Sequence, residues 1–214
     1  MGARSTIACL AADAARWGTT RLLHRGGGNA PGAVALRVDP GIIGALGGRL
    51  ERSVMVTGTN GKTTTTGLLA DALAADGTRV ACNRAGNNME SGIAAALVET
   101  RAARPQAGCF ECDELYTVRV MPALRPRALV LLNLFRDQLD RYGEIDHTQD
   151  VIAEALRRSG KTALVYNADD PLCASIAARV DNPGLPFGID EPTGLEADRI
   201  SDSRFCARCN APLD

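Results

Sequence analysis

A short glycine-containing loop, placed between an apolar run and a helical pattern, constrains this chain more than any other feature. The loop reads Thr57-Gly58-Thr59-Asn60-Gly61-Lys62-Thr63-Thr64; the run Val54-Met55-Val56 precedes it, and an apolar helical pattern over 62–76 follows it. Strand, glycine loop and helix in this order favour binding of a nucleotide polyphosphate, because glycines let backbone N–H groups face the phosphates. The helix N-terminus adds partial positive charge at the same place.

The residues of this loop have different expected roles. We expect Lys62 to reach the β- and γ-phosphates and the Thr63 hydroxyl to bind Mg²⁺. Lysine is scarce here, since Lys62 and Lys161 are the only lysines among 24 lysine and arginine residues, and a compact ammonium suits phosphate. Only the short form G-x-x-G-K-T is present, so the alternative is a plain glycine turn with an exposed lysine. The expected nucleotide-binding residues of the loop are Gly58, Thr59, Asn60, Gly61, Lys62, Thr63 and Thr64.

Composition and charge argue against several classes of protein. The chain has 214 residues, of which 45% are apolar and 23% charged, as in an ordinary globular domain. The net charge of −1 argues against a nucleic-acid-binding surface and against a patch for anionic membranes. No apolar run approaches the length of a transmembrane segment. Seven cysteines spread along the chain predict a reducing cytoplasm rather than a disulfide framework.

Alternating β-like and helical patterns predict an α/β fold with a mostly parallel sheet and helices on both faces. Ahead of the glycine loop we expect an amphipathic helix over 5–23, a short strand over 33–38 and a short helix over 40–50. The other expected strands are 53–57, 79–82, 107–112, 128–132, 162–166 and 185–188. The other expected helices are 62–76, 90–103, 147–158 and 170–179.

Polar side chains follow four of the expected strands. They occur at 83–88, 111–114, 133–140 and 167–170. In a parallel sheet, ligands bind at the carboxyl ends of the strands, so we expect these segments to lie near the glycine loop. Glu111 is our first candidate for a carboxylate ligand of Mg²⁺, and with Lys62 it forms the expected catalytic set. An ordinary turn into a helix, with capping acids, is the alternative for 111–114.

Two further segments admit both a binding and a structural interpretation. The segment 133–144 is either a loop for metal and substrate or the capped start of a helix. Asn167 and Asp170 are candidates to recognise the edge of a nucleotide base. Asp170 followed by Pro171 is equally a good N-cap and first-turn pair, and we favour that interpretation for Asp170 whether or not the segment also binds adenine.

The cysteines include two C-x-x-C pairs of different kinds. Cys109 and Cys112 lie in an expected strand, where residues three apart point to opposite faces, so we expect no shared metal or redox role. Cys206 and Cys209 look like half of a zinc site. A structural zinc ion needs four ligands, and no histidine has the spacing to complete this pair. We therefore predict weak or no zinc binding by this chain.

Taken together, these motifs resemble the Mur ligase superfamily of ATP-dependent amide ligases. The strings G-T-N-G-K-T-T, E-x-D-E, N-x-x-x-D-x-x-D and N-A-D-D-P occur here in that family's order. Within the superfamily the chain is similar to the MurT group, because of the segment 133–146, the short stretch ahead of Gly58, and cysteines after N-A-D-D-P. The resemblance implies a central ATP-binding domain at 51–192 after a lead-in at 1–50, and the first half of a cysteine ribbon at 193–214. It also implies ATP and Mg²⁺, with Zn²⁺ in a completed ribbon.

The resemblance implies a reaction as well. In that group, ATP activates the α-carboxylate of the D-glutamate in lipid II as an acyl phosphate. Ammonia from the glutaminase partner GatD then displaces the phosphate. By resemblance, the chain would belong to peptidoglycan synthesis in the cytoplasm, with lipid II as substrate and no nucleic-acid partner. The alternative is a P-loop nucleotide-binding module without ligase activity.

The chain departs from the pattern of other Mur ligases in three respects. Gln138 stands where they have a histidine that helps to bind a second Mg²⁺, and Ala153 and Glu154 stand near their carbamylated lysine. By resemblance, the second half of the ribbon and a C-terminal ligase domain are missing. We therefore expect this chain to be inactive as a ligase on its own.

Overall fold

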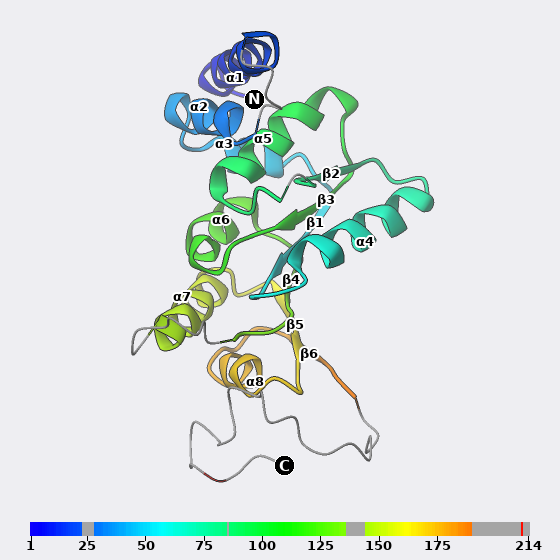
Figure 1. Ribbon diagram of the computed structural model, residues 1–214, viewed down its shortest axis with the longest axis vertical. Helices are drawn as coiled ribbons and strands as arrows, with labels where there is room; N and C mark the ends of the chain where they lie inside the picture. The colour runs from blue at the N-terminus through cyan, green and yellow to red at the C-terminus, as the bar shows by residue number, and fades with distance from the viewer. Residues whose placement is uncertain (23–27, 85, 136–143, 190–210, 212–214) are drawn as a thin grey trace.

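A sheet of six parallel strands, in the order β2-β3-β1-β4-β5-β6, organises the computed structural model (Figure 1). The structure describes residues 1–22, 28–84, 86–135, 144–189 and 211. The strands are β1 (Arg52–Thr57), β2 (Val80–Cys82), β3 (Ala107–Glu111), β4 (Ala128–Leu131), β5 (Ala163–Asn167) and β6 (Gly184–Phe187). The helices are α1 (Ala3–Leu22), α2 (Ala30–Val38), α3 (Ile42–Gly47), α4 (Lys62–Ala75), α5 (Glu90–Thr100), α6 (Thr117–Leu124), α7 (Glu144–Arg158) and α8 (Pro171–Ala177), with 3-10 turns η1 (Arg101–Ala103) and η2 (Glu114–Tyr116).

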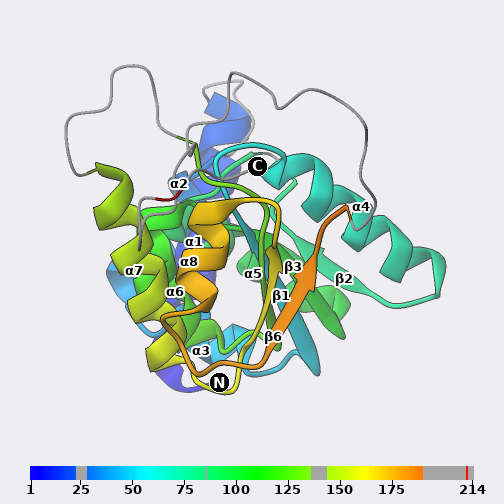
Figure 2. The same cartoon turned by 90° about the horizontal axis from the view of Figure 1, so that it is seen from below.

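Helices cover both faces of this sheet, as the sequence predicted. Figures 1 and 2 show α4 on one face and α6, α7 and α8 on the other. The helix α1 packs on α2, and α2 packs on α5, so the N-terminal helices lie at the end of the molecule farthest from β6 (Figure 1). Among the described helices, none is both long and apolar enough to cross a membrane.

The core lies between the central strands and the helices of both layers. Every residue of β3 is buried, which is typical of a parallel strand covered on both faces. The largest fully buried side chains are Phe110, Ile42, Ile43, Met55, Ile93, Met121, Leu129, Leu131, Ile152, Leu156, Leu164 and Ile176.

The order of the strands brings the loops after β1 and β4 together. From β1 the chain crosses to the edge strand β2 and returns to β3, whereas from β4 it continues in the opposite direction to β5 and β6. β1 and β4 are adjacent and parallel, with Thr57 opposite Leu131. Open parallel sheets bind ligands beyond the carboxyl ends of strands at such a reversal. The fold therefore places the glycine loop where a ligand site is expected.

The strand that we expected at 33–38 is wrong, because these residues form α2. Pro31 lies in the first turn of this helix, where its missing N–H costs no hydrogen bond. A Cβ at Gly32 would come within 1.7 Å of the carbonyl oxygen of Ser91 in α5. The glycine therefore lets two helices approach closely, and the apolar residues that suggested a strand pack between helices instead.

The helix α6 was not predicted from the sequence. It is short and contains Pro122, which argues against a helix interior. Its inward face buries Val120, Met121 and Leu124, and it ends at Arg125, whose φ is 52°. Burial of these three side chains therefore stabilises a helix that the local pattern does not favour.

Candidate functional site

The glycine loop joins the carboxyl end of β1 to the N-terminus of α4, in the predicted order of strand, loop and helix. Gly58 and Gly61 have φ angles of +130° and +85°, which L-residues with side chains rarely adopt. In addition, a Cβ at Gly58 would come within 2.8 Å of the carbonyl oxygen of Asn133. The loop therefore needs glycine at both positions, and at Gly58 for two independent reasons.

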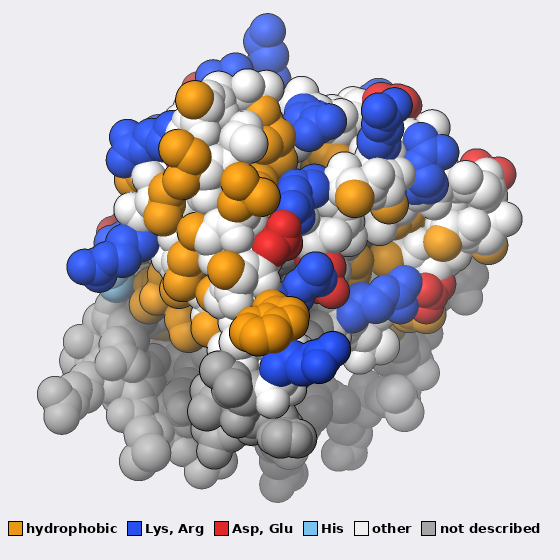
Figure 3. All heavy atoms as spheres, turned by 90° about the horizontal axis from the view of Figure 1, so that it is seen from above, with side chains coloured by type: hydrophobic (Ala, Val, Ile, Leu, Met, Phe, Trp, Pro, Cys, Tyr) orange, Lys and Arg blue, Asp and Glu red, His pale blue; other side chains and the backbone are white. Residues whose placement is uncertain are grey.

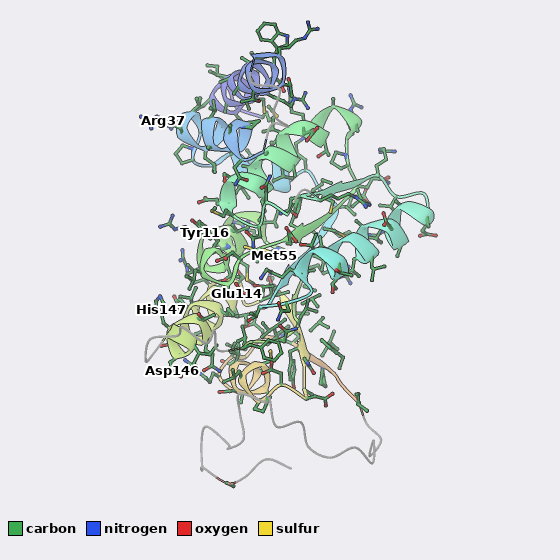
Figure 4. The ribbon with its side chains drawn as sticks, in the orientation of Figure 1. Arg37, Met55, Glu114, Tyr116, Asp146 and His147 are labelled. Carbon is green, nitrogen blue, oxygen red and sulfur yellow. The ribbon has the colours of Figure 1, made fainter. Side chains whose placement is uncertain are left out.

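Lys62 is the first residue of α4, and its side chain turns back over the loop. Its Nζ donates to the carbonyl oxygens of Gly58 and of Thr59, the latter at 3.3 Å. It also lies 3.2 Å from Oε1 of Glu114, and both side chains of this ion pair are 14% exposed. Figure 4 shows Glu114 near the middle of the molecule, where α4 begins. The three N–H donors of an ammonium thus each have an oxygen within the loop or beside it.

Asn133, in the loop after β4, holds the glycine loop in place. Its Oδ1 accepts the N–H of Asn60 at 2.9 Å, and its Nδ2 donates to the carbonyl oxygen of Asn60 at 3.1 Å. Its own carbonyl oxygen accepts the N–H of Thr59 at 2.9 Å. The N–H of Phe135 donates to Oγ1 of Thr59 at 3.0 Å. The first residues of the segment 133–144 therefore bind the glycine loop, while 136–143 lie outside the described residues.

These contacts decide which backbone amides can face a phosphate. The N–H groups of Thr59 and Asn60 already donate to Asn133. The first N–H groups of an α-helix have no partner inside the helix, so those at the start of α4 are available. The side chains of Thr63 and Thr64 are exposed there. Asn133 therefore engages the N–H groups of Thr59 and Asn60, whereas the first turn of α4 lies beside them with exposed threonine side chains.

Glu111 ends β3 next to the glycine loop and is 2% exposed. It lies opposite Val56 in the parallel pairing of β3 with β1. The side chain of Asn83 fixes its backbone, since Oδ1 accepts the N–H of Glu111 and Nδ2 donates to its carbonyl oxygen, both at 2.9 Å. This pair of bonds joins the segment after β2 to the end of β3.

Three of the five buried side-chain oxygens without a partner in the described residues belong to β1, β3 and α4, the elements next to the loop. Within the described part of the chain, Oε2 of Glu111 and Oγ1 of Thr57 and Thr66 are buried and accept or donate no hydrogen bond. Such atoms are costly unless something satisfies them. Mg²⁺ prefers hard oxygen donors, and the unpartnered Oε2 of Glu111 is of that kind, while the Thr63 hydroxyl lies on an exposed side chain at the start of α4. The described residues form no cluster of three or more His, Cys, Asp or Glu that could hold a metal ion.

The predicted N-cap at Asp170 is confirmed. Its Oδ1 accepts the N–H groups of Leu172 and Cys173 at 2.8 and 3.1 Å, and Oδ2 accepts the N–H of Leu134 at 2.8 Å. This carboxylate therefore joins the start of α8 to the loop after β4. Asn167, at the end of β5, accepts the N–H of Asp169 at 3.0 Å through Oδ1, and its amide nitrogen donates to no acceptor among the described residues.

Only one of the two C-x-x-C pairs lies within the described residues. Cys109 and Cys112 are buried free thiols. Burial raises the pKa of Cys109 to about 11 and the pKa of Cys112 well above its ordinary value. Both therefore stay protonated near neutral pH, which disfavours metal binding and redox exchange. Cys206 and Cys209 lie outside the described residues, so the zinc half-site stays a prediction.

Three residues that shape the site had no assigned role in our sequence analysis. Glu114 enters the sequence analysis only as part of the segment 111–114, although its place in the E-x-D-E string was a usable signal. Asn83 and Asn133 each follow a strand, which signals the edge of the sheet but not the contact that each makes. Each of the three binds a residue at or just after the end of a neighbouring strand, and local sequence patterns do not report such contacts.

Comparison with known proteins identifies the family. Residues 56–210 match the family described as the Mur ligase middle domain. The chain belongs to the Mur ligase family. Its fold agrees, because the MurF ligase of Thermotoga maritima in complex with ADP superimposes with a TM-score of 0.62 at 21% identity, over 73% of this chain and 37% of that one.

Two kinds of curated relative resemble this chain. Subunits named lipid II isoglutaminyl synthase (glutamine-hydrolyzing) subunit MurT are 33% identical in Staphylococcus aureus (strain COL) and 34% in Streptococcus pneumoniae, each over 91% of this chain. A UDP-N-acetylmuramoylalanine–D-glutamate ligase of Rhizobium meliloti is 39% identical over 61% of this chain and 26% of its own length. The chain spans 44% and 43% of the two MurT subunits, which is less than half of their length.

Proposed function

We propose that this chain is the ATP-binding part of a MurT-type subunit that amidates lipid II. The observation that carries the proposal is the extent of the similarity. The MurT subunits match along 91% of the chain, whereas the D-glutamate ligase matches along 61%. Similarity to the MurT subunits thus extends beyond the part of the chain that is shared with the D-glutamate ligase.

The proposed reaction converts the α-carboxylate of the D-glutamate in lipid II to an amide, giving D-isoglutamine. A carboxylate resists attack by ammonia because it has no good leaving group. ATP transfers a phosphoryl group to the carboxylate and so gives it phosphate as a leaving group. Ammonia then attacks the resulting acyl phosphate, and phosphate is released. A GatD-type glutaminase partner would release the ammonia from glutamine. The chain is thus one part of a glutamine-dependent carbon–nitrogen ligase.

Residues of this chain would bind and orient the nucleotide. The Lys62 ammonium would move from its three protein oxygens to the phosphates, where its charge opposes the charge of the transferring group. The first amides of α4 would bind phosphate oxygens directly. Glu111 and Thr63 would hold Mg²⁺, which shields the negative charge of the phosphates. Asn133 would keep the loop in shape, and the amide nitrogen of Asn167 would contact the base.

The cellular location, the zinc site, the domain division and the role of Asp170 are proposals as well. We place the reaction in the cytoplasm, because the five described cysteines are free thiols and ATP-dependent synthesis needs a nucleotide pool. Zinc binding by Cys206 and Cys209 would need a further pair of ligands. The domain division at 51–192 and 193–214 stays as the sequence predicted it. Asp170 would act on the nucleotide only through the position of the segment that it caps.

A chimera tests the ligase function against the alternative of a nucleotide-binding module. The chain would replace the matching part of the Staphylococcus aureus MurT subunit, and the chimera would be mixed with GatD, glutamine, ATP and lipid II. Amidated lipid II in the parent chimera, and its loss in a Lys62→Ala chimera, would support the proposal. Tight ATP binding by a folded chimera that produces no amidated lipid II would favour the binding module instead.

A further inference from the structure

The helix α1 is apolar on two opposite faces, and only one of them is covered. Ala8, Cys9 and Ala12 face inward and are at most 2% exposed. The opposite face carries Ile7, Leu10, Ala14 and Trp17, which we call the α1 stripe. Its large side chains are 58%, 62% and 61% exposed for Ile7, Leu10 and Trp17. The spacing of three, four and three residues aligns these side chains along one side of the helix.

Basic residues outnumber acidic ones on the helix that carries the α1 stripe. The helix contains Arg4, Arg16 and Arg21 but only one acid, Asp13. Among the described residues, Arg21 forms no ion pair, and the same holds for Arg37, which lies on the outer side of α2 (Figure 4). Figure 3, which views the α1 end of the molecule, shows hydrophobic side chains gathered on this face, with lysine or arginine side chains and a few acidic ones beside them.

Two of the acids near this end of the molecule form ion pairs, and a third, Asp39, is buried and accepts hydrogen bonds from the Ser5 hydroxyl and the N–H of Gly41. Asp13 forms ion pairs with Arg101 and Arg16, and Glu99 pairs with Arg16 at 3.2 Å. Arg4 donates through Nε to the last carbonyl oxygen of α2, that of Val38, at 2.8 Å, which holds it at the N-terminal end of the stripe. From the net charge of −1 we expected no patch for anionic membranes. That value is the total for the whole chain, however, and basic residues are locally in excess at this end.

We propose that the α1 stripe is a peripheral membrane-binding surface for a bilayer that contains anionic phospholipids. Helices of this kind bury an apolar face at the level of the headgroups, while their basic residues meet the lipid phosphates. Tryptophan is favoured at that depth because its ring is apolar with one polar N–H. A second copy of the chain fits less well, since a stable dimer buries roughly 800 Å² per subunit. Three side chains on one helix provide less surface than this.

Trp17 makes the test specific to the stripe, because it is the single tryptophan of the chain. The purified chain would be titrated with vesicles of phosphatidylglycerol and phosphatidylethanolamine, and with vesicles of phosphatidylcholine alone. We expect a blue shift of Trp17 emission, quenching by brominated acyl chains, and co-sedimentation with the anionic vesicles. Binding to phosphatidylcholine vesicles, or to anionic vesicles in high salt, should be weaker by at least about tenfold. The reason is that electrostatic attraction of each arginine to an anionic surface contributes to the binding free energy.

Substitutions show whether vesicle binding depends on the α1 stripe or on any exposed apolar side chain. The double variant Ile7→Ser, Leu10→Ser keeps Trp17 as reporter and should bind anionic vesicles at least about tenfold more weakly, because two apolar side chains no longer insert. Leu68→Ser, at a position on α4 that is 67% exposed, is the matched control and should bind like the parent. Circular dichroism would verify that each variant is folded.

Three results would overturn the proposal. The first is a parent chain that neither shifts its Trp17 emission nor sediments with anionic vesicles. The second is vesicle binding that the double variant retains in full. The third is self-association in sedimentation equilibrium that the double variant abolishes while vesicles go unbound, because the stripe would then join two copies. The vesicles contain neither nucleotide nor lipid II, so the outcome does not depend on the proposed ligase function.

Discussion

Lys62 and Glu114, 52 residues apart in the sequence, form a 3.2 Å ion pair beside the glycine loop. Both side chains are 14% exposed, so solvent screens this pair less than an ion pair on the open surface. A polyphosphate at the loop competes with Glu114 for the ammonium, and it brings further negative charge close to this carboxylate. The pair therefore keeps Lys62 at the loop and at the same time opposes the binding of an anion there.

Replacing Glu114 with Gln should strengthen binding of nucleotide in the absence of Mg²⁺. The affinity for free ATP should rise about fivefold, because a partly buried charge pair at this distance is worth about 1 kcal/mol. Isothermal titration calorimetry measures the change. Glu154→Gln, at an acid that is 52% exposed on α7, is the control and should leave the affinity unchanged. Weaker binding by Glu114→Gln would mean that Glu114 holds Lys62 in its phosphate-binding position.

Replacing Lys62 with Ala should weaken ATP binding without unfolding the domain. The expected loss is between about tenfold and a hundredfold, since hydrogen bonds to charged groups contribute about 1.5–3 kcal/mol. Lys161→Ala removes the other lysine, which is exposed, and controls for the loss of one positive charge. The comparison requires affinities from calorimetry and melting temperatures for both variants. Parent-like ATP affinity in Lys62→Ala would contradict the role of this residue.

The variant Glu111→Gln should show whether Glu111 binds Mg²⁺ or has only a structural role. We expect the affinity for ATP in the presence of Mg²⁺ to fall at least about tenfold, because the variant loses a charge-assisted contact to the ion. Affinity for ATP with a chelator present should stay close to that of the parent. The free energy of unfolding should not fall, because Oε2 of Glu111 forms no hydrogen bond within the described chain. If both affinities fall equally, Glu111 is structural.

Asn133→Ala should weaken both the fold and nucleotide binding. The side chain makes two hydrogen bonds to the backbone of Asn60, so its loss should lower the free energy of unfolding by about 1–3 kcal/mol. Asn182→Ala is a matched control, because Asn182 donates to two backbone oxygens, those of Ser159 and Thr162, away from the loop. Urea unfolding and calorimetry together distinguish the two variants. Only Asn133→Ala should reduce ATP affinity, and equal affinities in both variants would count against its role.

The sequence predicted the elements that local patterns define and missed the contacts that join them. The strand, glycine loop and helix around Lys62 are continuous in the chain, so residue types and spacing predict them well. The contact of Asn133 with Asn60 joins residues 73 apart, and it exists because β1 and β4 are neighbours in the sheet. No local pattern specifies that neighbour relation.

The two wrong or missed helices have the same explanation. α2 depends on the close approach of Gly32 to Ser91, and α6 depends on burial of apolar side chains around Pro122. In both segments tertiary packing outweighs the local preference of the chain. The N-cap at Asp170 was predictable, by contrast, because its partners are two and three residues away.

Two glycine substitutions within one strand–loop–helix unit test the backbone requirement of the site. Gly58→Ala should abolish nucleotide binding and destabilise the fold by more than about 1 kcal/mol, because a Cβ at φ +130° would come within 2.8 Å of the Asn133 carbonyl oxygen. Gly67→Ala, within α4, has no atom within 4 Å of the added Cβ.

The expected result for Gly67→Ala is a free energy of unfolding higher by about 0.5–1 kcal/mol, since alanine is the better helix former. ATP affinity should be unchanged in this variant, because the substitution lies beyond the first turn of α4. Chemical denaturation and calorimetry on the two variants give the comparison. A Gly58→Ala chain that binds ATP like the parent would show that the loop can rearrange around a side chain, and that its close contact with Asn133 is not needed for binding.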